Sequence, residues 1–235
     1  MRTALGAAAG AGAVAAWHAG PALTARGPLR GRIGGRGRPG GVALTFDDGP
    51  HPEGTPAVLD RLAALGWSAT FFLVGSEVRR HPRLAAAVVA AGHEVAVHGD
   101  AHENHLAHGP AWVAADLDRA LAAIGGATGV PPRWFRPPYG VLTGGTLRAA
   151  RRRSLTPVLW TAWGRDWESG TPESVVDTLR PGLRSGATLL LHDGAGTGAP
   201  GAWRTTADAL PLLDAELRRR GLDVRSLGEH LRSPR

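Results

Sequence analysis

The chain has 235 residues, which suits one domain with a large buried core but is short for a full eight-unit barrel. It contains no cysteine, which excludes disulfide frameworks and thiolate metal sites, so any metal must be bound by His, Asp or Glu. Arginine supplies all 27 basic residues and the net charge is +7. No arginine run is dense enough, or interleaved with aromatic residues, to form a nucleic-acid groove, so we expect no nucleic-acid partner.

Residues 1–40 differ in composition from the rest of the chain. Met1-Arg2 precedes an uncharged Ala/Gly-rich stretch that is short for a membrane span but resembles the start of a secretory signal. Residues 26–41, rich in Arg, Gly and Pro, are typical of a flexible linker. We assign 1–40 to a signal-like or anchor segment with its linker, and 41–235 to one catalytic domain. The signal-like composition of this segment favours a secreted or envelope-associated protein, with membrane association through the N-terminus. A cytoplasmic location stays open.

From Gly41 onward, short apolar runs alternate with helical patterns. The expected strands lie at residues 42–46, 69–74, 94–98, 134–136, 155–160, 188–192 and 222–226. The expected helices lie at residues 55–65, 77–91, 111–124, 145–153, 172–179 and 205–220. Several helices open with a cap or a first-turn proline, such as Thr55-Pro56 and Thr171-Pro172. Repeated strand–helix units closed by a further strand indicate an α/β fold, either a parallel barrel or a doubly wound sheet.

Polar residues follow five of these strands, in each case where the strand ends. Because the C-terminal ends of parallel strands meet at one edge of a sheet, we expect their side chains to converge on one face. In chain order these residues are Asp47 and Asp48, His98 and His102, Arg136 and Tyr139, Asp166 and Trp167, and His192.

Three of these residues suit a divalent metal. His98 and His102 are spaced i, i+4, so both imidazoles can face one ion on a helical turn or a tight loop. With Asp48 they form two histidines and one carboxylate, a set that leaves positions open for water, as in catalytic zinc sites and related divalent sites. Asp47 points elsewhere, because successive side chains at a strand end diverge, and is free to take a proton from water. Alone, Asp-Asp-Gly-Pro is equally typical of a turn.

Two further pairs suit proton transfer and positioning. An apolar strand leads to His192, whose ordinary pKa near neutrality suits a general acid, although the residue could simply end the strand. Asp166 is a better partner for its other ring nitrogen than Asp193, which is adjacent in sequence and points away. Arg136 could orient Asp47 or form a structural salt bridge.

Other residues near these motifs have weaker roles. We expect the histidines at positions 51, 105 and 108 to be loop residues, with His105 a minor candidate for a substitute ligand. Trp160, Trp163 and Trp167 cluster at the expected mouth of the site, where aromatic rings could stack on sugars or fill the core.

These motifs together resemble the polysaccharide deacetylase family, carbohydrate esterase family four. The resemblance covers about residues 41–230, and its five motifs occur in the family's order. They are Thr45–Pro50, His98–His102, Phe135–Gly140, Asp166-Trp167 and Leu190–Asp193. The resemblance implies a distorted (β/α) barrel with about seven parallel strands. It also implies metal-dependent hydrolysis of an N- or O-acetyl group from a sugar.

The resemblance also implies a role for each matching residue. The implied catalytic residues are Asp47 as general base, Arg136 orienting it, His192 as general acid and Asp166 orienting that histidine. The implied ligands of a divalent metal are Asp48, His98 and His102, with zinc as the expected metal and cobalt or nickel as alternatives. The implied substrate contacts are the Tyr139 backbone N–H at the oxyanion, and Trp167 and Leu190 around the acetyl group.

Two positions depart from the family's pattern. Gly99 stands where the family usually has a Ser or Thr whose hydroxyl helps to hold the loop, and Glu103 stands where a proline often follows the second histidine. Neither removes a catalytic role, so we expect a deacetylase of an N-acetylated glycan such as a cell-wall polysaccharide. Two other functions stay open: hydrolysis of small amides on the same fold, and non-catalytic glycan binding in the envelope.

Overall fold

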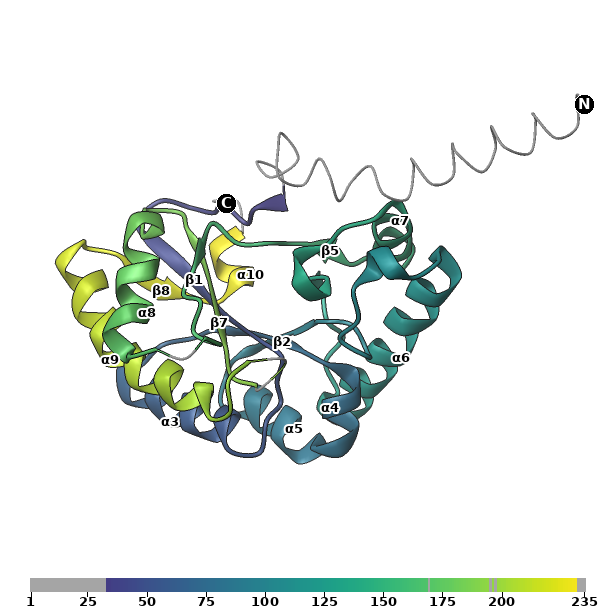
Figure 1. The fold of residues 1–235 in the computed structure, drawn as a ribbon, viewed down its shortest axis with the longest axis horizontal. Coiled ribbons are helices and arrows are strands. Elements are labelled where there is room, and N and C mark those ends of the chain that lie inside the picture. Colours follow the sequence, from purple (N-terminus) through teal and green to yellow (C-terminus); the bar gives the residue numbers. More distant parts are fainter. Residues whose placement is uncertain (1–32, 169, 195, 197, 232–235) are drawn as a thin grey trace, which may run out of the picture.

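The computed structural model describes residues 33–168, 170–194, 196 and 198–231, so the predicted signal-like segment lies almost entirely outside them. Within the described residues, eight strands form one curled sheet in which every pair is parallel. Figure 1 shows the helices arranged around the outside of these strands. The expected distorted (β/α) barrel is therefore confirmed.

The element bounds define this barrel. The strands are β1 Gly41–Asp47, β2 Thr70–Leu73, β3 Glu94–Val97, β4 Trp134–Phe135, β5 Thr156–Pro157, β6 Ala162–Trp163, β7 Thr188–His192 and β8 Asp223–Arg225. The α-helices are α3 Gly54–Leu65, α4 Gly75–Arg80, α5 Pro82–Ala90, α6 Pro110–Thr128, α7 Gly144–Arg152, α8 Pro172–Leu179, α9 Ala202–Arg219 and α10 Leu227–Leu231. The sheet order is β5-β4-β3-β2-β1-β7-β6, with β8 paired to the start of β1, so β1 pairs with three strands.

The folded unit begins before residue 41, where we expected a flexible linker to end. The Gly37 N–H donates to the Gly186 carbonyl at 3.0 Å, and the Gly35 carbonyl accepts the Thr188 hydroxyl at 2.6 Å. The backbone of this segment is thus hydrogen-bonded to the sheet region before residue 41. In the described part of the chain, no helix has the length and apolar character needed to cross a membrane.

Strand β1 alternates its side chains between the two faces of the sheet. The side chains at positions 42, 44 and 46 are apolar and fully buried in the main core between the sheet and the helices. Thr45 and Asp47 face the barrel interior, where Arg136 donates a hydrogen bond to each. One strand therefore supports the core with one face and the site with the other.

The prediction of a single strand at residues 155–160 is wrong. The structure has two short strands in this region, β5 and β6. Pro157 has no N–H to donate to a ladder. The carbonyls of Val158 and Leu159 accept hydrogen bonds from the Arg136 side chain, at 3.2 and 2.9 Å, rather than from a strand. The extra strand accounts for eight strands in the described residues where seven were expected.

The single helix expected at residues 77–91 is two helices, α4 and α5. His81 separates them with φ −131° and ψ 54°, outside the helical region. Pro82 causes the break because its ring disfavours the helical conformation of the residue before it, whereas proline is well accepted as the first residue of α5. Elsewhere α6 and α9 begin earlier than expected, and the short α10 was not expected.

The predicted helix caps have different outcomes. Thr171 caps α8 in a reciprocal capping box with Ser174, as its position indicated. Thr55 lies inside α3, which begins at Gly54 without a side-chain cap. The Thr55 hydroxyl instead donates to the carboxylate of Asp193 and so links α3 to the residue after β7.

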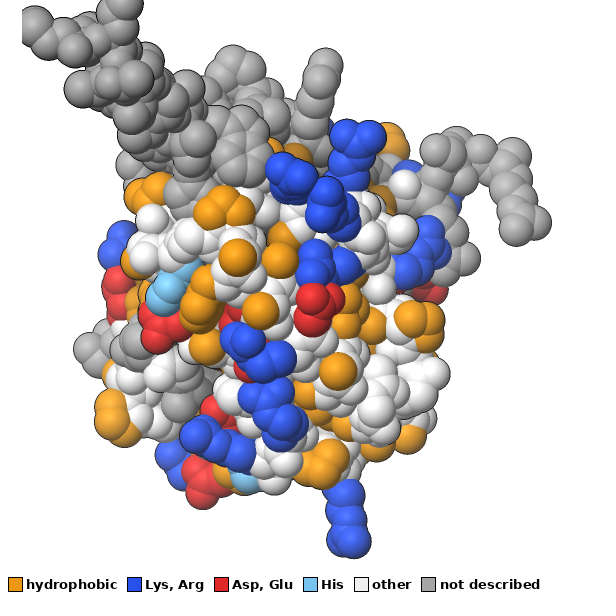
Figure 2. Space-filling model, turned by 90° about the vertical axis from the view of Figure 1, so that its right-hand side faces the viewer, with side chains coloured by type: hydrophobic (Ala, Val, Ile, Leu, Met, Phe, Trp, Pro, Cys, Tyr) orange, Lys and Arg blue, Asp and Glu red, His pale blue; other side chains and the backbone are white. Residues whose placement is uncertain are grey.

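The outer face formed by α6 and α7 carries several arginine side chains. Arg148, Arg151 and Arg152 of α7 are exposed. Figure 2 shows arginine side chains spread over this side of the molecule, with acidic and apolar side chains between them. On this face Arg153 forms an ion pair with Asp118 of α6. Charges of both signs therefore lie on this face.

Phe46 provides a test of the core. Its side chain is fully buried and stacks on Phe71 with ring centroids 5.1 Å apart. Phe46→Ala leaves a cavity in the core and is expected to lower the free energy of unfolding by about 3–5 kcal/mol, measured by urea denaturation. The exposed Leu212→Ala on α9 is the control and should change this free energy by less than about 0.5 kcal/mol. A Phe46→Ala protein as stable as the parent contradicts this assignment of the core.

Candidate metal and catalytic site

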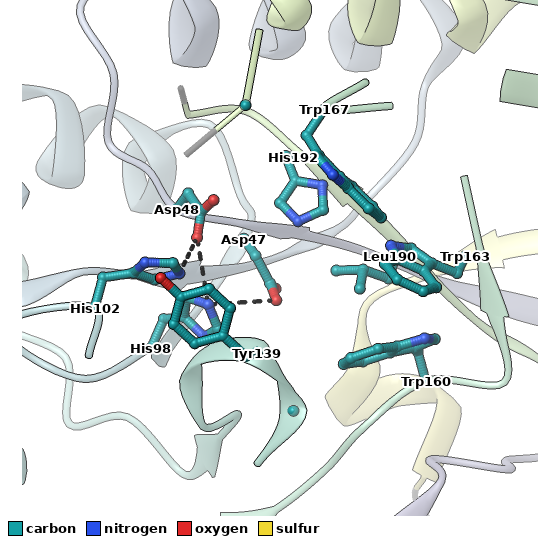
Figure 3. A pocket seen from close by; sticks show the side chains of 12 residues that line it. Asp47, Asp48, His98, His102, Tyr139, Trp160, Trp163, Trp167, Leu190 and His192 are labelled. Atoms are coloured by element: carbon teal, nitrogen blue, oxygen red, sulfur yellow. Dashed lines mark ion pairs between the residues drawn. The ribbon is translucent and has the colours of Figure 1, made fainter. Parts of the chain in front are cut away.

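One pocket at the C-terminal ends of the strands brings the predicted residues together (Figure 3). Its volume is about 250 Å³. The lining residues predicted from the sequence are Asp47, Asp48, His98, His102, Tyr139, Trp167, Leu190 and His192. The other two predicted residues, Arg136 and Asp166, are buried directly behind Asp47 and His192.

Strand register explains this convergence. In the parallel sheet, Asp47 at the end of β1 is aligned with His192 at the end of β7. The Arg136 N–H donates to the Val97 carbonyl at 2.9 Å, so the residues that follow β4 lie beside those that follow β3. Residues far apart in the chain therefore meet because their strands end at the same level.

Asp48, His98 and His102 form the one group in the described residues whose ligand atoms lie close enough to share a metal ion, all within 4.8 Å of one another. The Asp48 Oδ1 atom lies 3.3 Å from His98 Nε2 and 3.0 Å from His102 Nε2. Tetrahedral zinc with bonds of about 2.0–2.1 Å separates its ligands by about 3.3 Å. Asp48 Oδ1 is buried and accepts no well-formed hydrogen bond from any described residue. The donor set therefore fits a divalent cation.

The electrostatics of the triad keep Asp48 ionised. Burial raises the pKa of Asp48, but the imidazoles of His102 and His98 outweigh burial and hold that pKa well below its ordinary value. His98 Nδ1 lies 2.8 Å from the Arg136 carbonyl, which can only accept, so Nδ1 carries the proton. When His98 is neutral, this tautomer leaves its Nε2 atom unprotonated on the side of Asp48, as a metal ligand requires.

The backbone around the pocket adopts unusual conformations. Positive φ values occur at five described non-glycine residues, and three of them line the pocket: Asp48 at 76°, His102 at 51° and Tyr139 at 59°. Such conformations cost energy and persist where surrounding contacts enforce them, which is common at functional sites. The backbone outliers therefore point to the same pocket as the polar side chains.

Asp47 is held from inside the barrel. Arg136 Nη1 donates to Asp47 Oδ1 at 2.6 Å, and neither side chain is more than marginally accessible to solvent. The second carboxylate oxygen, Oδ2, lies 3.7 Å from His98 Nε2 and so faces the metal triad. The Asp47 carboxylate is thus fixed at one oxygen and directed at the triad by the other.

His192 is held by Asp166. Its Nδ1 lies 2.9 Å from Asp166 Oδ1, and the Thr206 hydroxyl of α9 donates to Asp166 Oδ2 at 2.7 Å. Burial lowers the pKa of His192, but the charge and hydrogen bond of Asp166, with the charges of Asp48 and Asp47, outweigh burial and raise that pKa to about 9. The imidazole therefore carries a proton at neutral pH.

Aromatic rings form one wall of the pocket. Trp163 stacks on Trp167 with centroids 4.5 Å apart, and Trp160 tilts against Trp163 at 5.7 Å. Trp167 in turn meets His192 edge-on at 5.1 Å. Tyr139, with its side chain 52% exposed, stands on the opposite side over His102. The tryptophans are therefore part of the pocket as well as of the packing around it (Figure 3).

A second hollow continues the pocket on the far side of the triad. Asp48, His102 and Tyr139 line both spaces. Beyond them, the second space is lined by polar side chains that include Glu77 and Glu103. We call these two adjoining spaces together the groove: one part has the tryptophan wall, and the other has Glu77 and Glu103 among its lining residues.

Some site residues differ from the sequence-based expectation or were missed by it. His105, a minor candidate for a ligand, does not join the triad, because it is fully buried with Nδ1 3.0 Å from Thr146 Oγ1. Thr206 was missed because nothing in the sequence shows which face of α9 meets Asp166. Thr45 was missed although the sequence could have indicated it. Alternate residues of a strand face the same side, so Thr45 shares the inward face of β1 with Asp47.

Asp193 points away from the site, as its position beside His192 indicated. Its carboxylate is fully buried against the Thr55 hydroxyl. Burial raises the pKa of Asp193 to about 7. This carboxyl group therefore supports the end of β7 from behind.

Known proteins share this sequence and fold. A family model for polysaccharide deacetylase matches residues 34–158. Over 196 residues the chain is 38% identical to a chitooligosaccharide deacetylase of Bradyrhizobium sp. (strain ANU 289), covering 79% of this chain and 88% of that protein. Among solved structures, a peptidoglycan N-acetylglucosamine deacetylase matches with a TM-score of 0.78 and 26% identity, over 83% of this chain and 90% of that one.

The chain belongs to the polysaccharide deacetylase family, as its motifs implied. It is accordingly a hydrolase of carbon–nitrogen bonds other than peptide bonds. A pseudoenzyme of carbohydrate esterase family four from Bacillus anthracis matches with a TM-score of 0.75 and 26% identity, over 83% of this chain and 66% of that one. Because the fold also occurs in a pseudoenzyme, catalysis depends on the side chains of the site and does not follow from the fold alone.

The contact of Asp166 with His192 generates a pH prediction. Asp166→Asn removes the negative charge that raises the pKa of His192, so the imidazole loses its proton at lower pH than about 9. The alkaline limb of kcat/KM for deacetylation is expected to shift to lower pH by about 1–3 units. The pH–rate profile of the purified variant measures this shift. Glu168→Gln, which alters an exposed ion pair with Arg165, is the control; an unshifted limb in Asp166→Asn contradicts the assigned pairing.

Proposed function

We propose that the protein is a metal-dependent deacetylase that removes acetyl groups, chiefly N-acetyl groups, from a glycan such as a chitooligosaccharide or a cell-wall polysaccharide. One observation carries the proposal: a triad that fits a divalent cation shares one pocket with the Asp47 carboxylate, fixed by Arg136, and the His192 imidazole, fixed by Asp166. Family membership supports the glycan as the substrate class.

Asp48, His98 and His102 would hold the metal, with zinc as the first candidate and cobalt or nickel as alternatives. When bound, the metal supplies an activated water and polarises the acetyl carbonyl. The histidine ligands are prepared for this role, since the proton of His98 is held on Nδ1 by the Arg136 carbonyl.

Asp47 acts as the general base in this proposal. Its Oδ2 faces the triad and accepts a proton from water there, while Arg136 keeps Oδ1 engaged and prevents rotation of the carboxylate. The Tyr139 N–H, held in a loop with positive φ, donates to the carbonyl oxygen as negative charge develops on it.

His192 acts as the general acid. Asp166 accepts from Nδ1, so the Nε2 proton is the one available in the pocket. Donation of this proton to the departing nitrogen releases a free amine, which is the step that makes amide cleavage possible. Trp167 and Leu190, which line the pocket beside His192, would enclose the acetyl methyl group and exclude water from it.

Two alternatives differ in ways that the site can distinguish. A small amide would fill only the space next to the triad, whereas the groove also includes a second space beyond Asp48 and exposes Tyr139 and Trp163. A non-catalytic glycan-binding protein needs no metal ligands, whereas the ligand set here is complete. Both observations favour the deacetylase. A screen of chitin oligomers against small amides, together with metal analysis of the purified protein, separates the three functions.

Asp47→Asn tests the proposed base. Loss of the proton acceptor is expected to reduce acetate release from N-acetylglucosamine oligomers, with zinc or cobalt added, by about 100- to 10,000-fold. Metal content should stay at the parent level, because Asp47 is outside the ligand triad. The control, Asp60→Asn on the exposed face of α3, should retain full activity. Full activity in Asp47→Asn shows that the assigned mechanism is incorrect.

Trp163→Ala tests the aromatic wall. Trp163 is 38% exposed and offers a flat apolar surface to the C–H face of a sugar ring. Its loss is expected to raise KM for chitotetraose by about 3- to 10-fold, from about 0.5–1.5 kcal/mol of stacking. A shorter oligomer, which does not reach Trp163, should be less affected. Trp203→Ala on α9, outside the groove, is the control; equal effects of the two variants on KM rule out a specific contact.

A further inference from the structure

The loop that carries the two histidine ligands is tightly curved. Gly99 and His102 have φ values of 78° and 51°, so the chain turns through the left-handed region twice within four residues. The carbonyls of Gly99 and Asp100 accept the N–H groups of Gly75 and Ser76 at the start of α4, each at 3.0 Å. These contacts fix one side of the loop and leave its N–H groups facing the other way.

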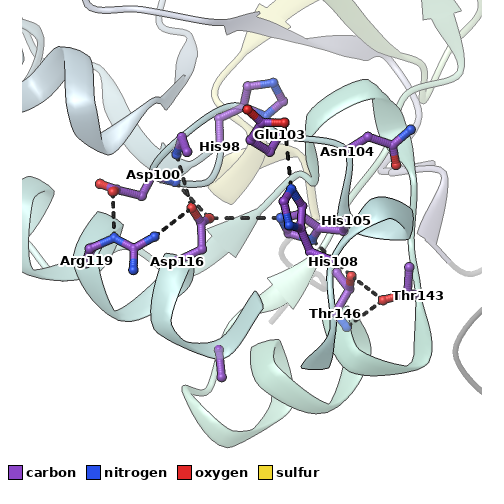
Figure 4. A network of polar contacts seen from close by, with 12 residues as sticks. His98, Asp100, Glu103, Asn104, His105, His108, Asp116, Arg119, Thr143 and Thr146 are labelled. Carbon is purple, nitrogen blue, oxygen red and sulfur yellow. Dashed lines mark hydrogen bonds and ion pairs between the residues drawn. The ribbon is translucent and has the colours of Figure 1, made fainter. Parts of the chain in front are cut away.

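Asp116 of α6 meets those N–H groups. Its Oδ2 accepts the Asp100 N–H at 2.9 Å, and its Oδ1 accepts the Ala101 N–H at 3.1 Å (Figure 4). The Asp116 side chain is only 1% exposed. One buried carboxylate therefore bonds two successive amides between the two histidines.

The absence of a side chain at position 99 is matched to this carboxylate. A Cβ atom on Gly99 would lie 3.1 Å from Asp116 Oδ2 and 3.3 Å from Pro138 Cγ, which is closer than most such contacts. The positive φ disfavours other residues as well. Asp116 therefore lies in the direction in which a side chain at position 99 would project.

Further contacts hold Asp116 and Asp100 in place. Arg119, one turn along α6, donates to Asp100 Oδ2 at 2.9 Å and lies 3.4 Å from Asp116 Oδ1. Arg79 of α4 donates to both oxygens of the Asp100 carboxylate. On the opposite side, His105 Nε2 lies 4.0 Å from Asp116 Oδ2. The loop is therefore connected to both α4 and α6 by buried or partly buried charges.

We propose that Asp116 is the positioning residue of the metal site. By accepting the Asp100 and Ala101 N–H groups, its carboxylate sets the curvature that directs His98 and His102 at Asp48, in place of a side-chain hydroxyl at position 99. The inference rests on the metal triad of the proposed function. It concerns metal affinity and geometry, and assigns Asp116 no contact with the substrate.

Asp116→Asn tests this role with little change in side-chain size. Asparagine offers one acceptor oxygen, and its NH₂ group then faces a backbone N–H, so one of the two loop bonds is lost. We expect Zn²⁺ affinity of the chelator-treated full chain, measured by competition with a chromophoric chelator, to fall by about 10- to 100-fold. The visible spectrum of the Co²⁺-loaded variant should also change, because it reports the coordination geometry.

Asp118→Asn is the matched control. It makes the same change two residues along α6, where the exposed Asp118 carboxylate pairs with Arg153. Zn²⁺ affinity and the Co²⁺ spectrum should match those of the parent in this variant. A folded Asp116→Asn protein whose Zn²⁺ affinity is within twofold of the parent overturns the inference, even if its unfolding temperature is lowered.

A second variant covers the case in which Asp116→Asn does not fold. Arg119→Gln alters a half-exposed residue that contacts both Asp100 and Asp116, and is expected to weaken Zn²⁺ binding by about 3- to 10-fold. Unchanged affinity in that variant overturns the inference. The parent could bind Zn²⁺, and Asp116→Asn could weaken that binding, while the parent releases no acetate from any glycan. That outcome leaves the inference intact and overturns only the proposed activity.

Discussion

The buried ion pair of Arg136 with Asp47 joins the fold of this protein to its site. The Arg136 side chain has no solvent exposure, stacks on Phe72, and donates to Asp47, Thr45 and the carbonyls of Val158 and Leu159. A charge buried this deeply is tolerated only when it is paired and its donors are satisfied. Because its partners come from β1 and from the segment after β5, this one side chain connects opposite sides of the barrel interior. The geometry of Asp47 is therefore inseparable from the shape of the barrel.

The charge balance around the pocket follows from that pair. Arg136 is committed to Asp47, so the neighbouring Asp48 depends on the imidazoles of His98 and His102. A divalent cation bound between these three residues would add positive charge beside the Asp48 carboxylate. Asp166 holds His192 as Arg136 holds Asp47, because in each case a fully buried partner fixes a side chain that lines the pocket. Asp47 and His192 thus each have one polar atom held from behind and another on the side of the pocket.

The sequence predicts the site better than it predicts the elements that support it. Residues at strand ends could be placed because the alternation of apolar runs and helices implies that parallel strands end together. The strand at 155–160 could not be placed, since the carbonyls there bond to an arginine that is distant in sequence. Asp116 and Thr206 left no signal either, because which face of a helix meets a loop depends on how the helix packs. Pro82, by contrast, does predict the end of α4, because a proline disfavours the helical conformation of the residue before it and so separates α4 from α5.

The groove that runs past the triad has chemically different ends. Tryptophans line one end, and Glu77 and Glu103 line the other. A glycan of the proposed kind is itself directional, with different groups exposed toward its reducing and non-reducing ends. A chain lying across Asp48 one way meets aromatic faces first and carboxylates second, and the reverse orientation exchanges these contacts. The two ends of the groove therefore differ in chemistry, and this asymmetry would favour one direction of a bound polymer over the other.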